Sequence, residues 1–281
     1  MDLYTKWYYR QDVQFEIIKF LKNRETAFLT KDSNQNPNSS RMHKIHSTQH
    51  FQLNMECVPY RLQHPYNIYH SVAKYIVGIP NQTLNFYDKS RSEVNQDWKG
   101  GTHHKNIYTY DFVVDIDAPS HDYMDIALES AKKLHKFYMY HGIPHEIRFT
   151  GMGFHFIVPD CGGWTKDYSP DLLNSLYRQI TQLAILLHNN ISEMIDLKIY
   201  DSRRVIKCPY TLSIYDDKAY LCWTFMTSLE LADFDYNLME IKKPLDFSKI
   251  IKSRGTFMFN QGCDSTKILD LKWQKGAFKL G

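Results

Sequence analysis

Two aspartates stand at the end of a short apolar segment. Residues 107–116 read IYTYDFVVDI, so Asp115 lies near the end of this run and Asp117 follows two positions later. Side chains two residues apart on a strand point to the same face, which brings both carboxylates together. Such a pair is repulsive without a cation, and hard divalent cations prefer carboxylate oxygens. The pattern indicates a divalent metal site; the alternative is a pair of acids that cap a following helix.

A glycine-containing segment comes next. Residues 148–159, RFTGMGFHFIVP, place Gly151 and Gly153 between two apolar stretches, with His155 shortly after them. Glycine permits a tight turn and lets a ligand approach the backbone. The segment is either an ordinary turn followed by a buried histidine, or a phosphate cradle in which backbone N–H groups and His155 lie near a triphosphate.

A third acid precedes a basic cluster. In residues 195–211, IDLKIYDSRRVIKCPYT, Asp196 follows an apolar residue, and Arg204 and Lys207 come after it. Both cations could reach one ligand, whereas Arg203 would point to solvent or to a template backbone. Taken alone, this segment also fits a charged strand on the protein surface.

Hydrophobic periodicity gives the elements that must position these residues. Asp111 shares the strand of the aspartate pair and would mark its start or form a salt bridge. The order strand, helix, hairpin, helix, strands suggests an α+β domain built on an antiparallel or mixed sheet. The polar stretches 31–49 and 92–106 read as irregular. Strands are expected over residues 107–116, 145–150, 154–159 and 219–226, and helices over 11–23, 66–76, 123–141 and 170–189.

Composition excludes several classes of protein. The chain has 281 residues, and its 43% hydrophobic content is typical of a folded core and not of a disordered protein. The net charge of +3 is too small to indicate nucleic-acid binding by itself. Five cysteines without a CxxC pair predict reduced thiols and neither a disulfide framework nor a zinc site. No apolar segment is long enough for a membrane span or a signal core, so we expect a cytoplasmic protein.

Together, the three segments resemble motifs of the archaeo-eukaryotic primase superfamily. Its first motif, a strand ending in acid–any–acid, matches Asp115 and Asp117, and its second, small–Gly–x–Gly–x–His–apolar–apolar–Val–Pro, matches residues 150–159. The third, an acid after an apolar piece, matches Asp196, and a basic–x–Pro–x–Ser-like segment matches residues 207–211. Three further segments resemble archaeal small primase subunits: residues 7–9, 23–28 and 69–75.

The resemblance implies a DNA primase-polymerase that transfers nucleotides by a two-metal mechanism. Two Mg²⁺ or Mn²⁺ ions would be held by Asp115, Asp117 and Asp196. A single-stranded DNA template and (d)NTPs are the implied substrates. The implied partners are a helicase, a large subunit, or replication proteins of CRISPR, plasmid or phage systems. The implied nucleotide-binding residues are Arg148, Thr150, Gly151, Gly153, His155, Arg204 and Lys207.

The implied fold is an RRM-like sheet of the primase small-subunit type, flanked by helices. Within one domain, residues 1–105 would form an N-terminal helical or αβ subdomain, residues 106–235 the metal-binding core, and residues 236–281 a C-terminal extension. Thr150 stands where serine is usual, and Lys207 replaces an arginine and so loses the bidentate fork. The cysteine-rich zinc insertion of cellular primases is missing, which resembles the compact enzymes of plasmids, phages or CRISPR-associated systems.

Other functions stay open at this point. A gap-filling or repair polymerase of the same superfamily would extend primers without making them. A rolling-circle initiator would need a His–apolar–His pair, and His43 and His46 are spaced differently. A non-catalytic single-strand binding module would have no reason to place three acids in a phosphate groove. The sequence does not reveal the preferred sugar, the ability to initiate, the pathway or the oligomeric state.

Overall fold

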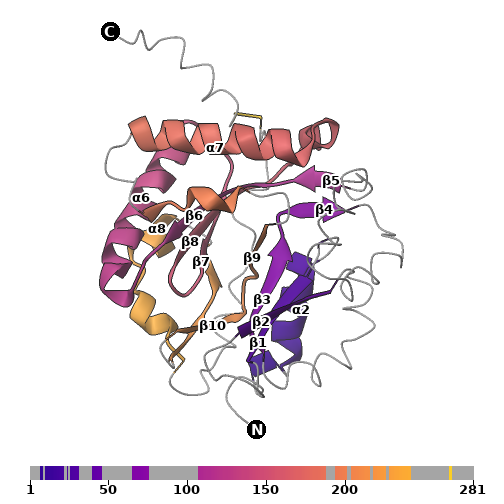
Figure 1. The fold of residues 1–281 in the computed structure, drawn as a ribbon. Helices are drawn as coiled ribbons and strands as arrows, with labels where there is room; N and C mark the ends of the chain where they lie inside the picture. Colours follow the sequence, from indigo (N-terminus) through magenta and orange to yellow (C-terminus); the bar gives the residue numbers. More distant parts are fainter. Residues whose placement is uncertain are drawn as a thin grey trace.

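The computed structural model contains two four-stranded sheets with helices packed on them (Figure 1). All strand pairs within these sheets are antiparallel, so the expected α+β class with an antiparallel sheet agrees with the structure. The subdivision into three segments stays a prediction. The structure describes residues 7–8, 10–21, 24, 26–31, 40–45, 65–75, 107–187, 194–200, 204–215, 218–225, 228–241 and 266–267.

The first sheet carries the aspartate pair and has the strand order β12-β7-β8-β6. Along β7, Ile147 and Phe149 alternate with Glu146 and Arg148, which suits a sheet with one face against an apolar core. A short strand pair, β4-β5, precedes β6 along the chain. The bounds are β4 Ala73–Tyr75, β5 Ile107–Tyr110, β6 Phe112–Asp117, β7 Glu146–Phe149, β8 Gly153–Val158 and β12 Trp223–Thr224.

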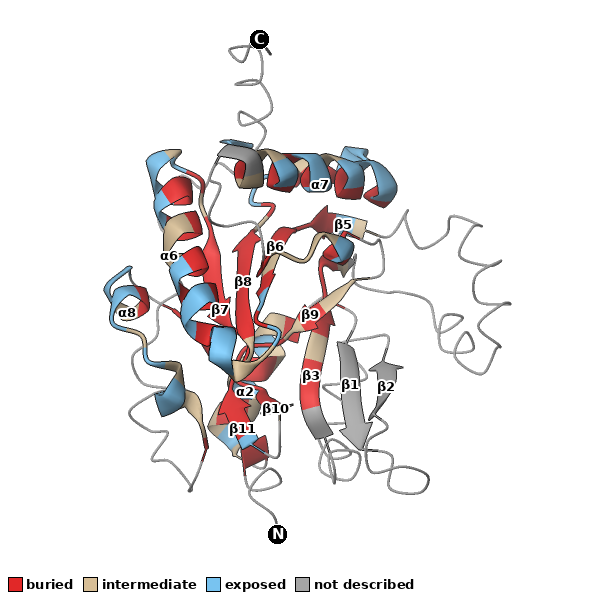
Figure 2. Ribbon diagram, turned by 60° about the vertical axis from the view of Figure 1, so that its left-hand side comes forward, coloured by how far each residue is buried: buried red, intermediate tan, exposed pale blue. Residues whose placement is uncertain are grey.

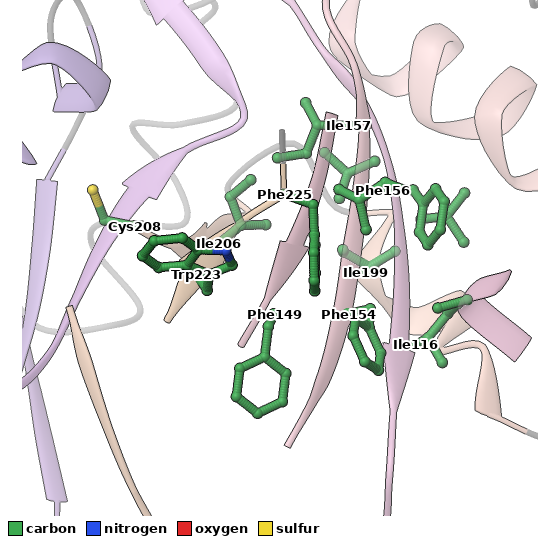
Figure 3. Close-up of a cluster of buried hydrophobic side chains, with 14 of the residues drawn as sticks. Ile116, Phe149, Phe154, Phe156, Ile157, Ile199, Ile206, Cys208, Trp223 and Phe225 are labelled. Carbon is green, nitrogen blue, oxygen red and sulfur yellow. The ribbon is translucent and has the colours of Figure 1, made fainter. Parts of the chain in front are cut away.

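Two long helices cover one face of this sheet (Figure 2). Helix α6 (Met124–Tyr140) packs on β6 and β8, and α7 (Pro170–Leu187) packs on β6. Their apolar residues recur at helical spacing, as the sequence predicted. The ring of Tyr138 in α6 meets that of Phe156 in β8, with centroids 5.8 Å apart. Figure 3 shows Phe156 and Phe154 among the side chains of this core.

The second sheet, β2-β1-β3-β9, lies beside the first and packs against helix α2 (Gln11–Leu21), whose Val13, Ile17 and Leu21 are buried. A further hairpin, β10-β11, connects β9 to β12, and a short helix, α8, follows. The bounds are β1 Thr26–Lys31, β2 Ser40–Ile45, β3 Pro65–Ser71, β9 Val205–Lys207, β10 Leu212–Tyr215, β11 Lys218–Leu221 and α8 Ser228–Ala232.

The helix expected over residues 66–76 is wrong, because this segment forms β3 and β4. Its residues Tyr, Ile and Val favour strands, and β3 pairs with β1 on one side and β9 on the other. Likewise, residues 40–45 of the stretch read as irregular form β2. The irregular region 92–106 lies outside the described residues.

A buried ion pair ties the N-terminal segment to the first sheet. Arg24 bonds to the Asp111 carboxylate and also donates to the carbonyls of Ser71 and Val72, each at 2.8 Å. The charge of Arg24 holds the pKa of Asp111 below its usual range, against the opposing effect of burial. Of the two roles expected for Asp111, the salt bridge is confirmed. Both side chains are almost fully enclosed, so loss of either partner would leave a buried charge.

Two buried histidines join α6 to the start of β7. His145 Nδ1 donates to the Ile143 carbonyl, so its Nε2 must accept from His135 Nδ1, at 2.8 Å. His135 Nε2 in turn accepts from the Ser228 hydroxyl. Burial lowers the pKa of His145 to about 4. The pair is therefore neutral at physiological pH.

This arrangement predicts acid-sensitive folding. The unfolded chain takes up a proton near the ordinary histidine pKa of about 6.5, whereas folded His145 does so only near 4. Stability is therefore complete above about pH 6.5 and is lost as the pH falls toward 4. Between pH 7 and pH 5 we expect about 2 kcal/mol of unfolding free energy to disappear through this residue. Denaturant titrations of wild type and His145→Phe at both pH values measure this loss. An equal change in unfolding free energy between the two pH values for both proteins would contradict the prediction.

One cysteine differs from the sequence prediction. Cys161 is disulfide-bonded, so the expectation of only reduced thiols is wrong for this residue. Cys208 and Cys222 are free and buried, as expected for small apolar side chains. No helix among the described residues is long and apolar enough to cross a membrane.

Candidate active site

Strand β6 presents its two aspartates on the face opposite to α6 and α7. Asp115 pairs in register with His155 on β8, which pairs with Arg148 on β7. Residues directly opposite one another on antiparallel strands share a face, so these three side chains form a row across the sheet. Asp117 lies on the same face, opposite Gly153. The pleat thus produces the shared face that the aspartate spacing predicted.

Asp196 reaches this edge through backbone contacts. Ile195 forms an isolated antiparallel bridge with Ile116, and the Asp196 N–H donates to the Asp115 carbonyl at 3.0 Å. One carboxylate oxygen from each of Asp115, Asp117 and Asp196 lies within 4.8 Å of the others. Three acids distant in the chain are therefore neighbours in the fold.

The chemistry of this cluster fits a divalent cation. Asp115 Oδ1 is buried and has no hydrogen-bond partner among the described residues; His155 Nε2 lies 3.3 Å away, but not in hydrogen-bonding geometry. Reduced access to water, together with the charges of Asp115 and Asp196, raises the pKa of Asp117 to about 6. Carboxylate oxygens that lie close together and repel one another are suitable ligands for Mg²⁺ or Mn²⁺.

The glycine turn joins β7 to β8 beside the acids. Thr150 N donates to the Gly153 carbonyl at 2.9 Å, and Gly151 has φ +95°. A Cβ at Gly153 would lie 1.9 Å from the Ile116 carbonyl oxygen, and one at Gly151 would lie 2.5 Å from Ser213 Cβ. Both glycines are therefore required by contacts within the protein, whether or not a ligand also approaches them.

Lys207 lies at the same turn. Its ammonium donates to the Thr150 carbonyl at 3.0 Å and to the Ser213 hydroxyl at 2.7 Å. Its charge partly offsets the rise in the pKa of Asp117, so the ammonium and the acids act on one another. The structure thus brings Lys207, the glycine turn and the aspartates together.

The two predicted arginines have other partners in this structure. Arg148 is buried, donates to Glu146 through Nε and Nη2, and donates to His70 Nε2 at 2.6 Å. Arg204 donates to the carbonyls of Lys198 and Ile199. Neither guanidinium is directed by these bonds at the carboxylate cluster. Arg203 lies outside the described residues.

Sequence reasoning missed two neighbours of the site. Ser213 bonds to Lys207 and touches the Gly151 position. Tyr69 pairs in register with Lys207, and burial, with smaller contributions from Asp117 and Asp115, raises its pKa to about 12. The strand signal in residues 65–71 could have found Tyr69, because a strand there has to pair with another. No local pattern points to Ser213.

Comparison with known proteins supports the fold. No protein-family model matches the chain, and no curated protein sequence matches it. A solved structure, the polymerase domain of Mycobacterium tuberculosis Ligase D in complex with DNA, matches with a TM-score of 0.51. The match covers 89% of this chain and 86% of that chain, at 12% sequence identity. At this identity the likeness shows a shared fold, and the activity of this chain is a separate question.

Proposed function

We propose that this protein is a nucleotidyltransferase that extends a DNA strand against a template and can also synthesise primers. The observation that carries the proposal is the convergence of Asp115, Asp117 and Asp196 beside a glycine turn that holds Lys207. An acidic cation site next to a positive charge is the combination that a metal-bound triphosphate needs. The fold shared with a DNA-bound polymerase domain supports the same proposal.

In this proposal the three aspartates hold two Mg²⁺ or Mn²⁺ ions. Ions in such a site lower the pKa of an attacking 3′-hydroxyl and stabilise the leaving pyrophosphate. The protein's contribution is to hold three carboxylates at fixed positions through β6 and the Asp196 backbone bond. Among the described residues, no hydrogen bond occupies Asp115 Oδ1.

The triphosphate would lie between the acids and the glycine turn. Lys207 would contribute its positive charge, and the N–H groups of Gly151 and Gly153 would face the phosphates. His155 would serve the same task; in support, its Nδ1 is buried and has no hydrogen-bond partner among the described residues. Thr150 would fix the turn through its bond to Gly153. Arg148 would support the site from behind, through Glu146 and His70.

The second candidate function is primer extension without primer synthesis. One solved structure that shares this fold is the polymerase domain of a ligase, and such a setting favours an enzyme that fills in existing strands. In both cases the template is single-stranded DNA, held by backbone charges and stacking, while base pairing supplies sequence selection. An RRM-like core of the primase small-subunit type fits both candidates.

Synthesis on bare template separates the candidates. The full chain is incubated with unprimed single-stranded DNA, Mn²⁺ and either NTPs or dNTPs, and in parallel with a primed template. We expect short new products from the first substrate and extended primers from the second. Extension alone would support the second candidate. Binding of DNA with no incorporation on either substrate would contradict both and leave a single-strand binding module.

A further inference from the structure

Arg204 holds the turn that carries the third aspartate. Its Nε donates to the Ile199 carbonyl at 3.0 Å, and its Nη2 donates to the Lys198 carbonyl. These carbonyls belong to the short 3-10 turn Leu197–Ile199, whose N-cap is Asp196. A guanidinium that binds two successive carbonyls fixes the orientation of a turn more firmly than a single point charge.

Asp196 makes its own bonds to β6 and within the turn. Its Oδ1 accepts from the Lys198 N–H at 2.7 Å, and its own N–H donates to the Asp115 carbonyl. The bond from the Lys198 N–H lies within the turn, so it orients the carboxylate only if the turn itself is held in place. Arg204 holds the turn in place. It directly precedes β9, and its own carbonyl accepts a hydrogen bond from the Val72 N–H at 3.1 Å.

We propose that Arg204 is a positioning residue for the metal site: it orients Asp196 through the carbonyls of Lys198 and Ile199, linking this ligand to the second sheet. The inference rests on the proposed function and changes the role that the sequence suggested for Arg204. Residues that orient metal ligands typically contribute 10–100-fold to metal affinity.

A positioning role and a purely electrostatic role for Arg204 predict opposite changes in metal affinity when the residue is removed. If Arg204 acted only as a positive charge near the site, its removal would tighten cation binding, because a nearby cation repels the metal. If Arg204 bound phosphate, its removal would raise the nucleotide KM and leave metal binding without nucleotide unchanged or tighter. Only a positioning role predicts that loss of a positive charge weakens the binding of a positive ion.

The test measures Mn²⁺ binding to the full chain without nucleotide, by calorimetry and by the electron paramagnetic resonance signal of free Mn²⁺. Arg204→Met keeps a linear apolar stem but removes all donors, and we expect its Kd for Mn²⁺ to rise about tenfold. Arg204→Lys keeps the charge and can reach one carbonyl, so its Kd should rise less. Lys198→Met is the matched control, since it removes an exposed cation from the same turn but keeps the backbone groups of Lys198 that bond to Asp196 and Arg204. Its Kd should stay the same or fall.

Three results overturn the inference in different ways. If the Kd of Arg204→Met for Mn²⁺ equals that of the wild type, or is lower, Arg204 does not position Asp196. Equal weakening in Arg204→Met and Lys198→Met would point to general disruption of the turn. Both conclusions leave the proposed function intact. Absence of Mn²⁺ binding to the wild-type protein would instead reject the metal site itself, and with it this inference. Thermal unfolding checks that each variant is folded; if Arg204→Met is not, Arg204→Lys decides between the roles.

Discussion

Replacing Asp115 by alanine should abolish nucleotide incorporation while leaving DNA binding in place. Asp115 provides a buried carboxylate oxygen that has no hydrogen-bond partner among the described residues and lies near oxygens of Asp117 and Asp196. In the proposed two-metal site, the remaining two acids could not hold the ions in the geometry that the transition state needs. The loss should be on the order of 10³-fold or more in rate, which corresponds to several kcal/mol of barrier. Single-turnover extension of a labelled primer in Mn²⁺ measures the rate, and a gel-shift titration measures DNA affinity.

Asp122→Ala serves as the matched control for this experiment. Asp122 follows the strand closely but is exposed and lies outside the three-carboxylate cluster, so its variant should incorporate nucleotides like the wild type. Asp115→Ala should also fold normally, because removing one of several repelling acids relieves unfavourable charge. A rate for Asp115→Ala within a few-fold of that of Asp122→Ala would contradict the role of Asp115.

Replacing Gly153 by alanine should destabilise the fold and disturb the site together. The added Cβ would lie 1.9 Å from the Ile116 carbonyl oxygen, and backbone cannot move aside as a flexible side chain can. Strand β6 would have to shift, and Asp115 and Asp117 flank Ile116 on it. We expect a loss of about 3 kcal/mol or more in unfolding free energy, at the upper end for overpacked positions. Denaturant unfolding measures this loss, and Mn²⁺ binding at low temperature shows whether Asp115 and Asp117 keep their arrangement.

Gly162→Ala is the control, because a Cβ there meets nothing within 4 Å. Its unfolding free energy should stay within about 0.5 kcal/mol of the wild type, as is usual for surface positions. If Gly153→Ala were as stable as Gly162→Ala, the close approach of β8 to β6 at this point would be wrong. The placement of the aspartate pair against the glycine turn would then be wrong as well.

The first sheet was predictable because its signals are local. Residues 107–116 combine β-branched and aromatic side chains, and the structure places β5 and β6 there. The spacing of apolar residues over 123–141 predicted a helix, and α6 spans Met124–Tyr140. Two glycines between apolar stretches predicted the β7–β8 hairpin. In each case the pattern that specifies the element lies within the element.

The second sheet was not predictable in the same way. The spacing in residues 66–76 suits a helix as well as a strand, and pairing with β1 and β9 decides the outcome. These partners lie far away in the sequence, and no local rule identifies them. Because β3 was read as a helix, the proximity of Tyr69 to the site went unpredicted.

The partners of charged residues were the least predictable feature of the site. A basic residue near a motif looks the same in sequence whether it binds a ligand or another part of the protein. Arg148 is occupied by Glu146 and His70, and Arg204 by carbonyls of the Asp196 turn. Only the folded geometry separates these two from Lys207, which contacts the glycine turn. The metal-binding role of Asp196 was implied only by the family resemblance, because its bridge to β6 has no local signature.

A crystal soaked with Mn²⁺ and a nucleoside triphosphate would test the central claim most directly. We expect anomalous scattering from Mn²⁺ within bonding distance of Asp115, Asp117 and Asp196, and β- and γ-phosphates beside the turn 150–153 and Lys207. Mn²⁺ bound elsewhere, or a triphosphate on the far side of the sheet from His155, would contradict the account.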